Sequence, residues 1–159
     1  TVATWVKFDS TPNGAWAGIV TKSRDAEPWF GIWATPANQW HFATSGDGGN
    51  RVDAGVVTDG WHHMTGVHVS AASTSSLYED GALLKENANA VSGQTGVGDI
   101  WIGGAKSVTE FFKGWVDDTV IYDRALDPAE VTSLMTEDLL AVDPNGKAAT
   151  TWAALRRFQ

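Results

Sequence analysis

The chain has no cysteine, which excludes disulfide bonds, thiolate metal sites and thiol catalysis. Charged residues are few, 19% of the total, and the 11 basic residues form no run that could neutralise a row of phosphates. No apolar stretch approaches the ~20 residues that span a bilayer. The 19 acidic residues outnumber the 11 basic ones and give a formal charge of −8. We therefore expect no nucleic-acid partner and no membrane insertion, and any ionic partner should be a cation.

What the chain does contain is apolar residues, at 43%, and nine tryptophans among 159 residues. This length and composition predict one globular domain with a sizeable core. The sequence begins at Thr1 without an initiator methionine or a leader, so we expect a processed product or a fragment.

Short apolar runs separated by Gly, Asp, Asn, Pro and Ser clusters are typical of an antiparallel sandwich or barrel. We expect strands near residues 2–8, 16–24, 28–35, 38–45, 50–57, 61–70, 74–80, 82–87, 100–104 and 111–122. Asp80-Gly81 lies between two of these runs and suits a type I′ hairpin turn. Asp127, Pro128 and the apolar spacing that follows predict a short helix over 127–137. Residues 138–159 form an extension that could contain a strand or a helix.

Three stretches resemble the laminin G-like jelly-roll family of the concanavalin A-like superfamily. They are Trp61–Val67 with the Leu77–Leu83 hairpin, Ile100–Gly104, and Phe112–Leu126. The resemblance implies an all-β, antiparallel two-sheet jelly-roll sandwich with one short C-terminal helix, spanning residues 1–137. Family members usually carry one or two strands before the one that resembles Ala3–Lys7, so an N-terminal strand is expected to be missing. The extension 138–159, a second copy or an upstream segment would then cover the open edge.

Catalysis is not expected. Glycosidases that share this fold place carboxylates alternately along one strand, and no such run occurs here. Glu79 and Asp80 fall in a turn, whereas Asp117 and Asp118 are adjacent and point to opposite faces of a strand. A glycoside hydrolase with a displaced active site stays as an alternative.

The adjacent histidines His62 and His63 cannot easily converge on one metal ion, because neighbouring strand residues face opposite ways. Residue parity groups His63 with Trp61, Thr65 and Val67, which we interpret as the core face. His63 is therefore predicted to be a hydrogen-bonded structural imidazole.

Asp117 is the one candidate metal ligand. The superfamily often holds a structural Ca²⁺ where the corresponding Asp meets backbone carbonyls near the N-terminus, and hard oxygen ligands suit this ion. The alternative is that Asp117 hydrogen-bonds a loop or pairs with Arg124.

The candidate ligand-binding residues follow from strand alternation. Trp29 and Trp33 share one side of their strand, and Gln39 and His41 face the same side if the next strand pairs as a hairpin. A sugar ring could stack there, with Trp16 as a further contact. The alternatives are that the faces are inverted or that a loop or a second subunit covers the pair.

We therefore predict a secreted or cell-surface, non-catalytic module of the lectin type that binds a glycan or a matrix ligand. The alternative from another class is a domain for protein interaction or self-assembly through an open sheet edge.

Overall fold

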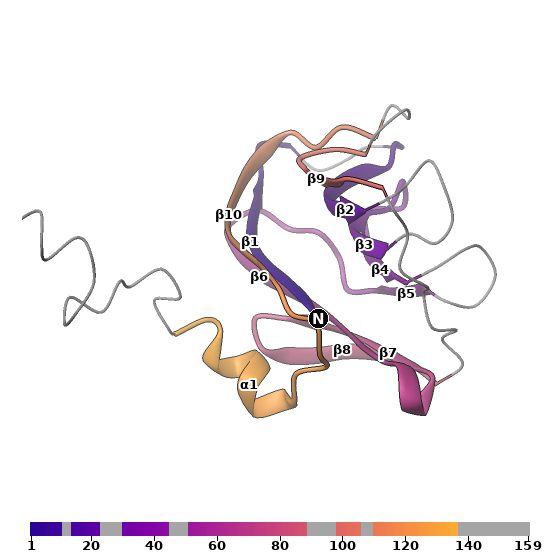
Figure 1. Cartoon of the computed structure of the whole chain (residues 1–159). Coiled ribbons are helices and arrows are strands. Elements are labelled where there is room, and N and C mark those ends of the chain that lie inside the picture. The colour runs from indigo at the N-terminus through magenta and orange to yellow at the C-terminus, as the bar shows by residue number, and fades with distance from the viewer. Residues whose placement is uncertain (11–13, 23–29, 45–50, 89–97, 106–109, 137–159) are drawn as a thin grey trace, which may run out of the picture.

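The computed structural model describes residues 1–10, 14–22, 30–44, 51–88, 98–105 and 110–136. Figure 1 shows two antiparallel sheets that face each other. Sheet A has the strand order β10 (Gly114–Ile121), β1 (Val2–Phe8), β6 (His62–Val69), β7 (Thr74–Glu79), β8 (Ala82–Asn87). Sheet B has the order β5 (Arg51–Ala54), β4 (Trp40–Ala43), β3 (Phe30–Ala34), β2 (Ala17–Lys22), β9 (Ile100–Ile102). The predicted all-β sandwich is confirmed.

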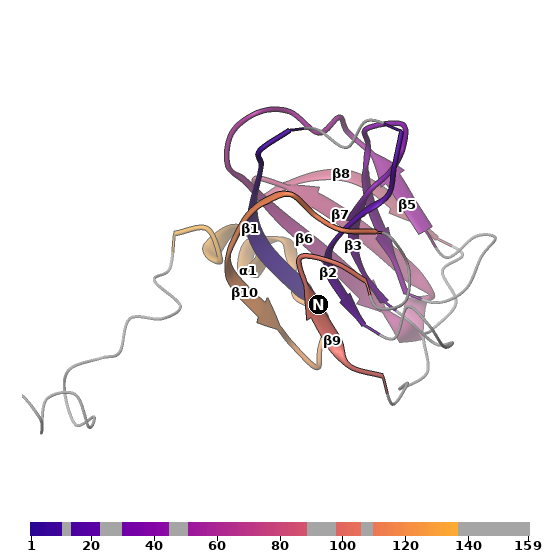
Figure 2. The same cartoon turned by 90° about the horizontal axis from the view of Figure 1, so that it is seen from above.

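The main core lies between the sheets, and Figure 2 shows the two layers from above. Alternate residues of each strand point into it, as the two-residue period of a strand requires. Sheet A contributes Val2, Val6, Met64 and Leu77, and sheet B contributes Ile32, Trp40 and Phe42, each at most 2% exposed. Burial of these side chains stabilises the sandwich by about 1.5–3 kcal/mol for each large one.

The hairpin between β7 and β8 has the predicted turn. Asp80 and Gly81 adopt positive φ angles of 48° and 75°, the combination that a type I′ turn demands at both central positions. Glu79 pairs with Ala82 across this turn. The Asp80 carboxylate also accepts a hydrogen bond of 2.7 Å from the His63 backbone N–H, which ties the turn to β6.

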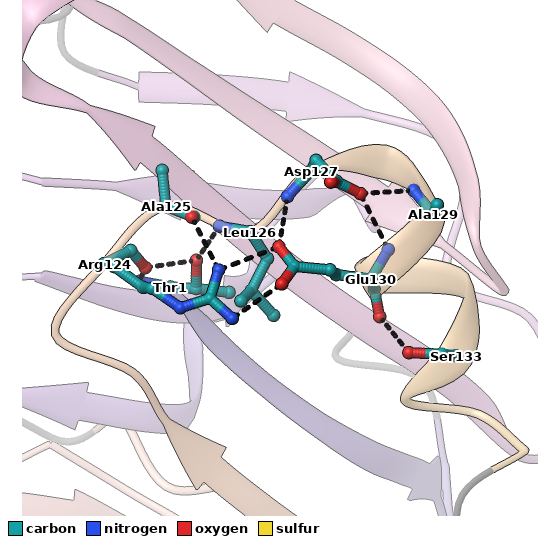
Figure 3. A network of polar contacts seen from close by, with 8 residues as sticks. All are labelled: Thr1, Arg124, Ala125, Leu126, Asp127, Ala129, Glu130 and Ser133. Atoms are coloured by element: carbon teal, nitrogen blue, oxygen red, sulfur yellow. Dashed lines mark hydrogen bonds and ion pairs between the residues drawn. The ribbon is translucent and has the colours of Figure 1, made fainter.

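The predicted helix forms as α1 (Pro128–Ser133) and ends four residues earlier than expected. Asp127 and Glu130 make a reciprocal capping box at its start, and Arg124 holds both carboxylate oxygens of Glu130 (Figure 3). Thr1 joins this corner to β1, because its hydroxyl donates to the Arg124 carbonyl and accepts from the Leu126 N–H. The extension 138–159 lies outside the described residues.

Helix α1 covers part of the outer face of sheet A. Its Val131 and Leu134 pack with Ala3, Val67 and Tyr78 in a second buried cluster. Both faces of sheet A are therefore partly apolar. A short 3₁₀ turn, Ser70–Ala72, joins β6 to β7.

The predicted orientation of β6 is wrong. Met64 points into the main core and Val67 points to the outer face, so His63 also lies on the outer side. Alternation could not reveal this, because α1 makes the outer face apolar as well. His63 is nevertheless 2% exposed, with Nδ1 3.4 Å from the Thr65 hydroxyl and its ring edge-on to Trp5. Burial lowers the pKa of His63, as expected for a structural imidazole.

Strands β10 and β9 have no partner on their outer sides among the described residues. The three residues of β9 are 39–57% exposed, and Ile121 of β10 is 43% exposed. No helix in the described part of the chain is long and apolar enough to span a membrane.

Candidate functional site

The outer face of sheet B carries the candidate site. Ile32 and Phe42 point inward, so Trp33 and His41 point outward, directly opposite each other on β3 and β4. Gly18 of β2 lies on the other side of Trp33. Gly31 of β3 leaves room for the indole ring, because a Cβ atom there would lie 2.9 Å from Cη2 of Trp33. The predicted facing and hairpin pairing of these strands are confirmed.

Three aromatic rings meet on this face. The His41 imidazole lies edge-on between the indoles of Trp16 and Trp33, with ring centroids 5.0 and 5.6 Å apart. Trp33 and His41 are only 2% and 3% exposed, whereas Trp16 is partly exposed. Trp33 and His41 therefore form a buried base, and Trp16 offers the ring surface that a ligand can reach.

A charged pair adjoins the rings on β5. Asp53 lies opposite His41, and its Oδ1 is 2.5 Å from His41 Nδ1. Its second oxygen is 3.4 Å from Nε of Arg51, a residue that is half exposed. The hydrogen bond from His41 lowers the pKa of Asp53, so this carboxyl is ionised at neutral pH. The site thus offers an aromatic edge, a fixed carboxylate and an exposed guanidinium.

Glu110 holds the base of the site in place. Its Oε2 accepts a hydrogen bond of 3.0 Å from the Trp33 indole N–H, and its backbone carbonyl accepts one from the Gly18 N–H. Glu110 is 8% exposed. A buried carboxylate that receives an indole N–H fixes the ring rather than serving a ligand.

The remaining predicted residues are less central. Gln39 is partly buried, and its backbone pairs with Thr35 in the turn before β4. Trp29 lies outside the described residues.

Three residues of the site were not predicted from the sequence: Arg51, Asp53 and Glu110. Alternation around the inward-facing Val52 would have placed Arg51 and Asp53 on this face, whereas no local signal connects Glu110 with Trp33, 77 residues away.

Asp117 lies on the outer face of sheet A, opposite Trp5. Its Oδ1 accepts the Asp118 N–H at 2.9 Å, and its carbonyl accepts the Thr4 hydroxyl at 3.0 Å. Ca²⁺ needs six to eight oxygen ligands. No group of three or more acidic or histidine side chains is gathered for a metal among the residues described. Backbone carbonyls would have to supply most ligands, and calcium binding by Asp117 stays a prediction.

A cavity of about 630 Å³ lies at one end of the sandwich. Phe30, Phe42 and Thr44 of sheet B line it on one side, and Gly66 and His68 of sheet A on the other. Of the predicted ligand-binding residues that the structure describes, none lines this cavity.

The fold is shared with several solved structures. The CBM40 of the Ruminococcus gnavus IT-sialidase is 17% identical, with a TM-score of 0.66 over 84% of this chain and 80% of that one. A SAP-like pentraxin from Limulus polyphemus is 14% identical, with a TM-score of 0.61 over 84% and 67%. The Trypanosoma rangeli sialidase is 19% identical, with a TM-score of 0.63 over 89% of this chain but 23% of that one.

No curated protein matches the chain at a significant level. Residues 1–132 match the sequence pattern of a family described as the concanavalin A-like lectin/glucanases superfamily. The match covers the two sheets and most of α1, which are the same elements that build the sandwich. The chain therefore belongs to the concanavalin A-like lectin/glucanase superfamily.

Proposed function

We propose that this protein is a non-catalytic carbohydrate-binding domain whose ligand occupies the outer face of sheet B. One observation carries the proposal: the partly exposed Trp16 rests on the buried pair Trp33 and His41, with Asp53 and Arg51 beside it. Apolar C–H faces of a sugar stack on an indole, and hydroxyl groups donate to a carboxylate. Both kinds of group are held rigidly here.

The Arg51 guanidinium supports an acidic sugar as the ligand. Arg51 is half exposed, and its planar guanidinium suits bidentate recognition of a carboxylate. The structure of the similar CBM40 from R. gnavus has been determined with α2,6-sialyllactose. Sialyllactose is therefore the first ligand to test.

The contacts of the acidic residues on this face agree with binding rather than catalysis. Asp53 is engaged by His41 and Arg51, and Glu110 by the indole of Trp33. A glycosidase needs one carboxyl group that can donate a proton and a second that is free to attack or to activate water. We further propose that the protein acts outside the cell, where glycan ligands are displayed, with Asp117 as a ligand of a structural Ca²⁺.

The second candidate function is protein interaction or self-assembly through a sheet edge. Two features favour it: the exposed side chains of β9, and the outer side of β10, which pairs with no other strand that the structure describes. An added strand at such an edge gains backbone hydrogen bonds and covers apolar side chains.

A glycan array tests the proposal. We expect binding by the wild-type protein that Trp16→Ala reduces at least ten-fold, whereas Leu83→Ala, which alters a residue that is 53% exposed on β8 of sheet A, leaves it unchanged. Arg51→Gln should also reduce the binding of acidic glycans. A silent array together with a size that grows with concentration on gel filtration would favour the edge interaction. Release of sugar from the array would show an enzyme.

A further inference from the structure

The outer face of sheet A holds a second row of aromatic side chains, far from the site on sheet B. Trp115 of β10 pairs with Lys7 of β1, and in the next position Asp117 pairs with Trp5. Trp5 in turn pairs with His63 of β6. Continuing that register by one residue beyond Val6 and His62 brings Trp61 beside Lys7. The aromatic row, as we call it, consists of Trp5, Trp61 and Trp115.

Among the described residues, the aromatic row lies on a part of this face that α1 leaves open. Helix α1 packs on Ala3, Val67 and Tyr78, toward the end of β10 from which the helix departs (Figure 1). Trp61 and Trp115 are 44% and 51% exposed. Trp115 is on β10, Trp61 immediately precedes β6, and β1 lies between these strands, so the two backbones are about 10 Å apart. One sugar ring or one amino-acid side chain is too short to contact both.

Charged groups lie beside the indoles. The Lys7 ammonium lies 5.3 Å from the centroid of the Trp115 ring, and the exposed Asp117 follows one pair further along β10. At the margin, Lys113 pairs with Asp9 at 2.8 Å. Lys7 and Asp117 thus place one cation and one carboxylate beside the indoles.

The charged residues beside the aromatic row favour an oligosaccharide over a protein as its ligand. The centre of a protein interface is depleted in lysine and aspartate, and burying Lys7 and Asp117 under a protein surface would cost their solvation. An oligosaccharide avoids this cost, because its ring faces stack on the indoles while its hydroxyls accept from an ammonium and donate to a carboxylate.

We infer that the aromatic row is a second glycan-binding site, for a neutral, linear oligosaccharide that extends across β10, β1 and β6. Trp115 and Trp61 stack on two separate rings of the ligand, and Lys7 and Asp117 bind hydroxyl groups between them. The inference rests on the proposed carbohydrate-binding role, but on a different face with its own residues. A protein with both sites can hold two glycans on opposite sides.

NMR of the indole N–H signals tests this on the full chain, with assignments from single Trp→Phe variants. The probes are the neutral cellotetraose and chitotetraose, and 6′-sialyllactose for comparison. We expect a tetrasaccharide to shift the Trp115 and Trp61 signals in a saturable way. Trp115→Ala should weaken that binding at least ten-fold and leave the Trp16 response to sialyllactose unchanged. Trp16→Ala should do the reverse.

The outcomes separate the two proposals. Shifts confined to Trp16 would overturn the second site and leave the proposed function standing, whereas shifts confined to the aromatic row would do the opposite. No response from any indole to any probe would count against both. A dimer that Trp115→Ala disperses on gel filtration would assign the row to a second copy of the chain and overturn the inference.

Discussion

His41 and Asp53 lie directly opposite each other on β4 and β5, with His41 Nδ1 2.5 Å from Asp53 Oδ1. This contact lowers the pKa of Asp53 in the folded protein. The stability that it contributes is fully present above the pKa of the carboxyl in the unfolded chain, about 3.9, and is lost as the pH falls through the lower folded value.

Asp53→Asn should therefore flatten the dependence of stability on pH below about pH 4. A hydrogen bond to a carboxylate at a partly exposed position contributes about 1 kcal/mol. Urea unfolding of wild type and variant across the acidic range measures this difference. Equal slopes for the two proteins would show that the contact does not stabilise the fold.

Gly66 is the second position with a sharp expectation. A Cβ atom there would lie 2.3 Å from the Phe42 ring, inside the main core. Gly66→Ala must displace Phe42 or β6, and such overpacking costs about 1–3 kcal/mol. Gly104→Ala is the control, because its added Cβ would meet its nearest neighbour, Phe111, at 3.4 Å. Thermal unfolding that places both variants at the same Tm would contradict this packing.

Helix α1 depends on its cap. The Asp127 carboxylate accepts hydrogen bonds from the N–H groups of Ala129 and Glu130. Asp127→Ala should cost about 1 kcal/mol of unfolding free energy, and Asp123→Ala, which removes an exposed acid outside the helix, should cost much less. Chemical denaturation measures both, and comparable losses would show that charge matters here rather than the cap.

Calcium gives a prediction that is measured as stability, because Asp117 is also assigned to the aromatic row. If Asp117 is a ligand, chelator should lower the Tm of the wild-type protein and added Ca²⁺ should restore it, because metal that binds only the folded state stabilises it. Asp117→Asn should abolish the response. If neither chelator nor Ca²⁺ changes the Tm, Asp117 does not bind a structural Ca²⁺.

Strand alternation predicted the outer face of sheet B and failed on β6, for a physical reason. In sheet B, Ile32 and Phe42 face the main core and His41 faces outward, so the two sides of β3 and β4 differ in character. In β6, Met64 faces the main core while Val67 lies beneath α1, so both sides are apolar.

Local sequence patterns also could not predict contacts between residues far apart in the chain. Glu110 reaches Trp33 across 77 residues of sequence, and the burial of Trp33 follows from that contact and from Trp16. The site therefore uses Trp33 as its base, where alternation alone predicted a ring exposed for stacking.

The most direct test of the proposed site is a crystal structure of the protein with the sialylated glycan that it binds best. We expect a sugar ring against Trp16, with polar groups of the ligand on Asp53 and Arg51. A glycan bound instead in the cavity between Phe30 and His68, or no bound glycan at saturating concentration, would contradict it.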